Sequence, residues 1–114
     1  MHSLITNSRQ TKAGTVEREL RLSRDTAGRL WAAVTETRHL KTISKVSLDL
    51  YDLTPIPADF GLGVQVDKTT GEDESYDVNL SEALGDSCTC PAGTYRGECR
   101  HLALARAARR LGLL

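Results

Sequence analysis

The feature that most constrains this chain is the segment DSCTCPAGTYRGECRHL, residues 86–102. It holds all three cysteines and one of the three histidines of the 114-residue sequence. The potential ligands form two pairs, each enclosing one residue: Cys88, Cys90, Cys99 and His101. Proline, two glycines and small polar residues occur in the gap between the pairs, which suits a chain that must fold back on itself. The fold therefore has to bring two short segments together at this point.

Three chemistries could use such a cluster, and the sequence favours one of them. A disulfide between Cys88 and Cys90 would close a small, strained ring and would leave the third thiol unpaired. A redox pair more often has two residues between its cysteines and lies at the start of a helix. Structural zinc uses all four residues, because it takes thiolate sulfur and imidazole nitrogen in a tetrahedron. We therefore predict one structural Zn²⁺ held by Cys88, Cys90, Cys99 and His101.

The same donor set predicts a metal without catalytic activity. A catalytic zinc usually keeps one coordination position open for water, whereas four protein ligands close the site. Three thiolates and a neutral imidazole leave the site with about one net negative charge, which makes zinc a poor Lewis acid. We interpret the nearby Glu98 as a surface residue, and the isolated His2 and His39 as residues outside any metal site. We expect no enzyme activity and no small-molecule substrate.

Composition and charge limit the remaining possibilities. Aromatic residues make up only 4% of the chain, so the core is modest and a metal would help to stabilise it. We find neither a signal-peptide pattern nor an apolar run of about 18 residues, so we expect a cytoplasmic protein with no membrane partner. Acidic residues dominate 51–87 and basic residues dominate 88–114, although the net charge is zero. This distribution argues against strong, indiscriminate nucleic acid binding but permits a local anion-binding patch.

The N-terminal half is expected to be an extension. Residues 1–14 are polar and small, which predicts a flexible lead. The segment 15–52 predicts a helical/strand extension, in which TVERELRL (15–22) permits either a helix or a strand. Ser23 or Asp25 is expected to cap a helix that runs through TAGRLWAAVTETRHL (26–40).

The C-terminal half is expected to carry the metal. KVSLDLY (45–51) alternates as a strand, and LTPIPADFG (53–61) predicts a connector. Apolar residues then alternate on both sides of the turn KTTGEDE (68–74), which predicts a β-hairpin. The helix expected at the end of the chain has one apolar face formed by His101, Leu104, Ala105, Ala108 and Leu111. The fold class is therefore α+β: a small zinc-stapled β-hairpin plus a C-terminal helix (ββα), with the N-terminal extension.

The spacing of the ligands resembles the SWIM zinc-finger family, whose motif is C-x-C, a variable gap and C-x-H. It stands here as Cys88-Thr89-Cys90 and Cys99-Arg100-His101, preceded by SYDVNL and followed by an Ala/Leu-rich helix. The resemblance covers residues 60–112 and implies a ββα zinc module that binds DNA or proteins. Such modules occur in transposases, in chromatin-remodelling-type ATPases and in proteins that assist recombinases. This chain has no ATPase motif and resembles a standalone module.

Arginines near the cysteines provide candidate contact residues. On one face of a helix, arginines can contact phosphates. The candidates in this chain are Arg96, Arg100, Arg106, Arg109 and Arg110. They favour a DNA-binding adaptor. The alternative is a protein–protein interaction subunit of a recombination, replication or transcription-related complex, in which the zoned charge meets a complementary partner. The sequence does not separate these two hypotheses.

Overall fold

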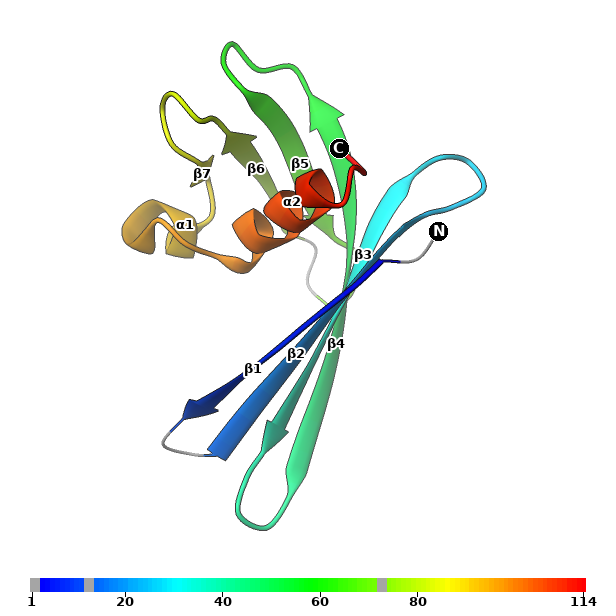
Figure 1. Ribbon diagram of the computed structural model, residues 1–114, viewed down its shortest axis with the longest axis vertical. Coiled ribbons are helices and arrows are strands. Elements are labelled where there is room, and N and C mark those ends of the chain that lie inside the picture. The colour runs from blue at the N-terminus through cyan, green and yellow to red at the C-terminus, as the bar shows by residue number, and fades with distance from the viewer. Residues whose placement is uncertain (1–2, 12–13, 72–73) are drawn as a thin grey trace.

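A computed structural model describes residues 3–11, 14–71 and 74–114 and shows one antiparallel sheet with a helix across one of its faces (Figure 1). The elements in chain order are β1 (Ser3–Thr11), β2 (Gly14–Arg24), β3 (Leu30–His39), β4 (Ser44–Ile56), β5 (Leu62–Lys68), β6 (Glu74–Leu80), β7 (Ser87–Cys88), α1 (Pro91–Arg96) and α2 (Arg100–Arg110). The strands lie in the sheet in the order β1 to β7, so each strand pairs with its neighbours in sequence.

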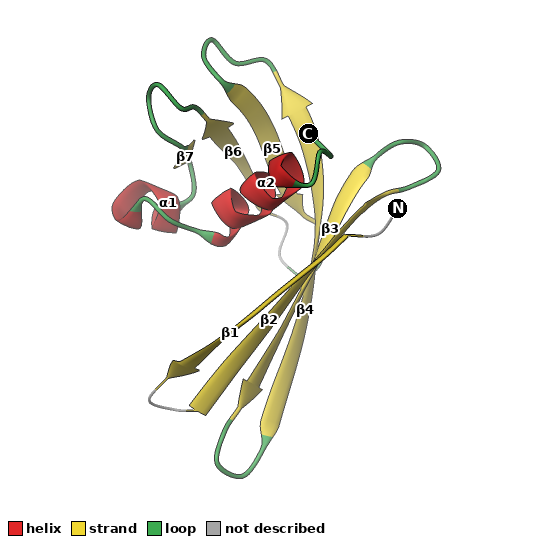
Figure 2. Ribbon diagram, in the orientation of Figure 1, coloured by secondary structure: helices red, strands yellow, loops and turns green. Residues whose placement is uncertain are grey.

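The prediction of a small ββα module with an extension is wrong. Six long strands and the two-residue β7 form one sheet, and β2, β3 and β4 belong to it (Figure 2). A single apolar core crosses the expected boundary and joins both halves of the chain. Its fully buried side chains include Leu22, Leu30, Val64, Val78 and Leu102. The sheet gives the chain more apolar surface to bury than a hairpin would, so the core does not depend on the metal alone.

The prediction of a helix over 26–40 is also wrong, because strand β3 (Leu30–His39) forms in this segment. The buried side chains alternate along this strand: Leu30, Ala32, Val34 and Glu36. Asp25, which we expected to cap a helix, accepts the backbone N–H groups of Ala27 and Arg29 through Oδ1, at 2.9 Å each. These bonds shape the turn between β2 and β3 instead. A side chain that accepts nearby backbone N–H groups serves a turn as well as a helix start.

Other elements agree more closely with the sequence. The strand predicted over 45–51 is confirmed within β4, although β4 continues to Ile56 into the expected connector. The predicted hairpin is confirmed as β5 and β6, and the C-terminal helix as α2. For 15–22 the strand alternative is correct, since these residues lie in β2. Strand β1 lies where we expected a flexible lead, and α1 lies in the expected loop between the two ligand pairs.

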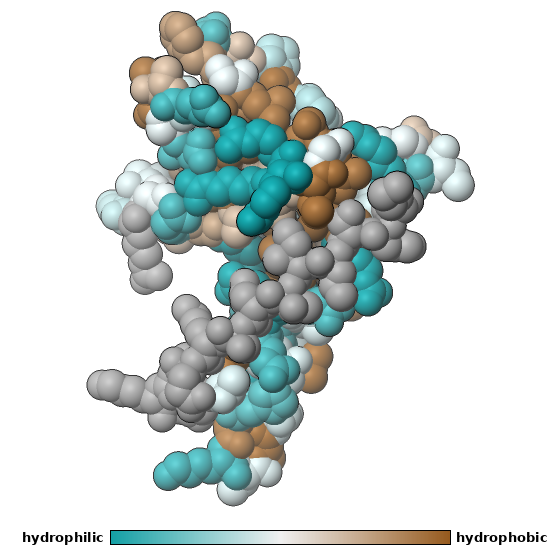
Figure 3. Space-filling view, in the orientation of Figure 1, coloured by the Kyte–Doolittle hydropathy of each residue, from teal (hydrophilic) through white to brown (hydrophobic). Residues whose placement is uncertain are grey.

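Helix α2 covers one face of the sheet and buries its apolar side there (Figure 2). The buried residues of α2 are Leu102, Leu104, Ala105, Ala107 and Ala108. Leu111, predicted on this face, is instead exposed at the end of the helix. Hydrophilic side chains lie over α2 on the side turned to the viewer in Figure 3. In the described part of the chain, neither helix has the length and apolar character that crossing a membrane requires.

Candidate metal centre

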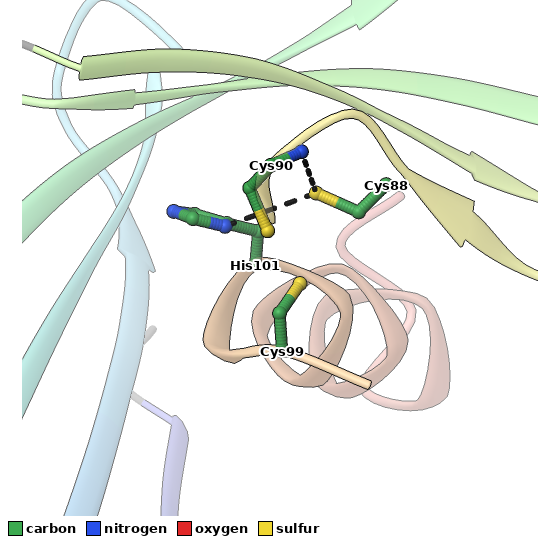
Figure 4. Close-up of side chains that lie close together, drawn as sticks. All are labelled: Cys88, Cys90, Cys99 and His101. Carbon is green, nitrogen blue, oxygen red and sulfur yellow. Dashed lines mark hydrogen bonds between the residues drawn. The ribbon is translucent and has the colours of Figure 1, made fainter. Parts of the chain in front are cut away.

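The four predicted ligands converge at the junction of the sheet and the helices (Figure 4). Their ligand atoms, three sulfurs and one imidazole nitrogen, all lie within 4.8 Å of one another. In a tetrahedral zinc site, the known bond lengths place two sulfurs about 3.8 Å apart and a sulfur and a nitrogen about 3.6 Å apart. The Nδ1 atom of His101 lies 3.8 Å from the Sγ atom of Cys88. Small movements of these side chains would therefore complete a tetrahedral metal site.

Three separate elements bring these ligands together. Cys88 ends the short strand β7, where it pairs with Val78 of β6. Cys90 is the N-cap of α1, and Cys99 is the N-cap of α2. His101 follows in the first turn of α2. Each ligand pair thus spans the start of an element, so a metal bound here would fasten both helices to the edge of the sheet.

Backbone N–H groups donate to all three sulfurs. The N–H of Cys90 donates to the Sγ atom of Cys88 at 3.5 Å. Gly93 donates in the same way to Cys90 at 3.2 Å, and Leu102 donates to Cys99 at 3.4 Å. Donors of this kind stabilise negative charge on sulfur and fix the direction in which each ligand points. The chain therefore provides the surroundings that three metal-bound thiolates need.

Gly93 is a site residue that we did not single out from the sequence. A Cβ atom at this position would lie 2.8 Å from the Cβ atom of Cys88 and 2.9 Å from its carbonyl oxygen. Real Cβ atoms essentially never approach a neighbour so closely. The absence of a side chain lets the first turn of α1 pack directly on β7. In the sequence, a glycine three residues after Cys90, in PAG (91–93), was the available sign that the chain packs closely at this point.

Burial controls the protonation of the ligands in the metal-free chain. It raises the pKa of Cys88 to about 12 and also raises the pKa of Cys99. Burial acts in the same direction on Cys90, but the backbone N–H of Gly93 and the neighbouring thiols outweigh it and lower the pKa. Burial lowers the pKa of His101, so its imidazole is neutral near pH 7, the form that binds metal. A metal ion must therefore displace thiol protons, above all from Cys88 and Cys99.

The ring of His101 is held by two tyrosines of the sheet. Its centroid lies 6.0 Å from that of Tyr51 in an edge-on arrangement and 4.9 Å from that of Tyr76 in a tilted one. Tyr51 comes from β4 and Tyr76 from β6. These contacts limit the rotation of the imidazole and keep its Nδ1 atom beside Cys88. The structure therefore favours Nδ1 as the metal-binding nitrogen.

Arg100, between two of the ligands, connects the metal centre to the long strands. Its guanidinium donates to Asp49 at 2.8 Å, to the hydroxyl of Tyr51 at 3.3 Å and to Glu36 at 3.3 Å. Glu36 is 5% exposed and also accepts from Arg18 and Arg38. These contacts direct the Arg100 guanidinium to the carboxylates of β3 and β4 rather than to the cysteine sulfurs. Recognising β3 as a strand would have placed Glu36 on the buried face.

The other candidate contact arginines differ in their surroundings. Arg106 forms ion pairs with Asp86 and with the exposed Glu98, both at 2.8 Å. Arg109 and Arg110 are exposed in the last turn of α2. Arg96 ends α1, and its side chain lies outside the part of the chain that is described. Arg109 and Arg110 are thus the candidates whose side chains lie on the outer surface.

The remaining histidines do not join the metal centre in the described part of the chain. His39 lies in β3 and contacts Ser44 and Glu17, and His2 lies outside the described residues.

Comparisons with protein-family models, with curated proteins and with solved structures find no match to this chain.

Proposed function

We propose that this protein is a non-catalytic zinc-binding module in which the metal fastens α1 and α2 to the sheet. The observation that carries the proposal is the convergence of three sulfurs and one imidazole nitrogen within 4.8 Å. Zinc suits this set, because it prefers tetrahedral sites made of thiolate and imidazole ligands. Four protein ligands leave no position for a reacting water, which supports a structural role. The C-x-C and C-x-H pairs support assigning the site to the SWIM type.

Metal analysis of the purified full chain tests this proposal. We expect one zinc per chain and a large loss of thermal stability on chelation, because metal binding here is coupled to folding. His101→Asn should lower the zinc content and the melting temperature. His39→Asn, which changes the exposed histidine of β3, should leave both unchanged. A protein that is purified without metal and is equally stable with and without a chelator would contradict the proposal.

We further propose that the module contacts DNA through the end of α2. The support is the pair Arg109 and Arg110, which are exposed side by side in the last turn of the helix. Arginines contact phosphates without reading the base sequence, so this surface would position the protein rather than select a site. Arg100 and Arg106 already bind carboxylates of the same chain, which leaves a small phosphate-binding surface. The expected DNA affinity is accordingly weak at physiological salt.

Fluorescence anisotropy with a labelled duplex across a salt series measures this surface. Two phosphate contacts predict a slope of log affinity against log salt of about −2. Arg109→Ala with Arg110→Ala should abolish that slope. The control pair Arg21→Ala and Arg29→Ala removes two exposed arginines elsewhere and should preserve it. Equal binding by both double variants would rule out the end of α2 as the contact.

The alternative is a protein partner for the same module. It is favoured by the internal ion pairs of Arg100 and Arg106 and by the zero net charge, both of which limit attraction to a polyanion. Under this alternative the zinc-loaded chain shows no salt-dependent affinity for DNA. A partner would then be captured by the zinc-loaded protein but not after chelation.

A further inference from the structure

Strand β4 carries a row of apolar side chains that the core does not use. Val46, Leu48 and Leu50 alternate along β4 and therefore lie on one face of the strand. The structure exposes this face and turns the opposite one, with Asp49 and Tyr51, towards the helix. The exposed fractions are 68% for Val46, 56% for Leu48 and 36% for Leu50. Apolar side chains concentrated in this way mark an interaction surface more often than ordinary solvent-exposed surface.

The same part of β4 has an open edge. Residues 44–53 pair with β3, whereas only residues 51–56 pair with β5. Residues 44–49 therefore have one neighbouring strand, and no second neighbour occurs among the described residues. We call this segment the β4 edge. It forms the right-hand margin of the lower part of the sheet in Figure 1, and brown, apolar atoms lie among hydrophilic ones in that region of Figure 3.

The hydrogen-bonding groups on the β4 edge can be assigned from its neighbours. The N–H and carbonyl of Leu50 point to the β5 side, where Thr70 Oγ1 accepts the N–H at 3.1 Å and the Thr69 N–H donates to the carbonyl at 2.8 Å. Backbone groups alternate in direction along an antiparallel strand. The N–H and carbonyl groups of Val46 and Leu48 therefore point to the open side, where the described chain provides no partner. An edge of this kind is a template for another strand.

We propose that two copies of this protein form a symmetric dimer by antiparallel pairing of their β4 edges. A two-fold axis through Ser47 places Val46 of each copy opposite Leu48 of the other. The groups that face the open side then meet as hydrogen-bonded pairs. The same register places Lys45 opposite Asp49 on the other face of the sheet. Neighbouring two-fold registers that also match the hydrogen-bonding groups, centred on Val46 or on Leu48, do not bring these opposite charges together.

The chemistry of the β4 edge favours a second copy as the occupant. The segment KVSLD is complementary to itself when reversed: an apolar pair lies on each side of Ser47, and Lys45 faces Asp49 at its ends. Asp49 also pairs with Arg100 and Lys68 of its own copy, so Lys45 of the second copy would join that ion-pair network. A closed dimer follows from one such self-complementary patch. Thr69 and Thr70 already occupy the open side at Leu50, so the pairing spans Lys45 to Asp49 of each copy. An interface this short predicts a weak dimer, with a dissociation constant of about micromolar order.

Sedimentation of the zinc-loaded full chain between about 1 and 200 µM tests the proposal over the range expected for a small interface. The wild type should change from monomer to dimer with concentration. Leu48→Lys should weaken the dimer at least about tenfold, because a charge on the edge opposes pairing. Leu84→Lys, which alters another exposed leucine (72% exposed) in the turn after β6, should leave it unchanged. Lys45→Glu should weaken the dimer more at low salt than at high salt.

Cross-linking determines the register. Ser47→Cys places two thiols at the two-fold axis, so mild oxidation should give a covalent dimer while zinc protects the natural cysteines. Ser44→Cys is the control, because its two copies would lie six residues apart along the paired strands, about 20 Å. A wild type that stays monomeric at the highest concentration would overturn the proposal. So would a dimer insensitive to Leu48→Lys, or equal cross-linking of both cysteine variants. Zinc content is independent of these outcomes, so they leave the metal proposal unaffected.

Discussion

Replacing Arg100 by glutamine tests whether the metal centre is connected to the long strands through this side chain. The guanidinium makes charge-assisted hydrogen bonds to Asp49 at 2.8 Å and to Glu36 at 3.3 Å. A hydrogen bond to a charged group is worth about 1.5–3 kcal/mol. The side chain of Arg100 is 27% exposed, and Glu36 keeps two other arginine partners, so each bond counts for less than this maximum. We expect Arg100→Gln to reduce the free energy of unfolding by about 2–4 kcal/mol.

Thermal and urea unfolding of the zinc-loaded protein measure this change. For a chain of this size, 1 kcal/mol corresponds to about 4 °C, so the melting temperature should fall by about 8–16 °C. Zinc content should remain at one per chain, because Arg100 is not a ligand. Arg21→Gln is the matched control: its side chain is 53% exposed and pairs with the exposed Glu19. That variant should lose less than about 0.5 kcal/mol.

A double-mutant cycle with Glu36→Gln assigns the loss to the ion pair. If Arg100 acts through Glu36, the double variant should be more stable than the sum of the single losses predicts, by about 1–2 kcal/mol. Arg100→Lys should recover part of the stability, because it keeps the charge but cannot reach two carboxylates at once. The reasoning is refuted if Arg100→Gln is as stable as Arg21→Gln. It is also refuted if the losses of the two single variants are strictly additive.

Three further predictions concern the metal centre and its surroundings. Gly93→Ala should weaken zinc binding at least about tenfold, because the new Cβ atom would lie 2.8 Å from the Cβ atom of Cys88. Competition with a metal indicator measures the zinc affinity, and unchanged binding would contradict the packing argument. Zinc affinity should rise at least about 100-fold per pH unit between pH 6 and 8, because burial raises the pKa of both Cys88 and Cys99 and each gives up one proton to the metal. A rise of tenfold or less would show that one of these two thiols is already ionised. Burial opposes ionisation of Glu36, but hydrogen bonds from arginines lower its pKa below the ordinary 4.5. The contribution of Glu36 to the free energy of unfolding is therefore present above pH 4.5 and is lost as the pH falls through the lowered pKa of the folded protein. The stability difference between the wild type and Glu36→Gln, followed by urea unfolding, should therefore shrink from pH 6 to pH 3, and a constant difference would exclude this linkage.

The convergence of the four candidate ligands was predictable because its information is local. Cys88 and Cys90 are separated by one residue, as are Cys99 and His101, so each pair needs only a short turn to present two ligands. The C-terminal helix was predictable for the same reason, since its apolar face follows from residues within three turns. The bond between Arg100 and Glu36 was not predictable, because Glu36 lies 64 positions before Arg100 and approaches it only when the sheet forms.

The fold was mispredicted where two periodicities compete. Between Leu30 and Val34, the sequence satisfies a helical stripe through Trp31 and also a strand in which every second residue is buried. The capping candidates Ser23 and Asp25 favoured the helix, whereas pairing with two neighbouring strands decided the outcome. Alternation over 45–51 correctly predicted a strand. It did not predict which face is buried, because that depends on the side on which α2 lies.

The order of strands in this sheet also bears on how the chain folds. Because every strand pairs with its neighbours in sequence, each pairing closes a short loop and loses little chain entropy. The most distant contacts are made by α2 and the residues that follow it, as in the bond from Arg24 to the carbonyl of Leu113, 89 positions away. During synthesis, the strands can therefore assemble before the residues that cover them have emerged. Until α2 docks, the apolar face around Leu22 and Leu30 stays open to water, and in that interval the growing chain is most prone to aggregate.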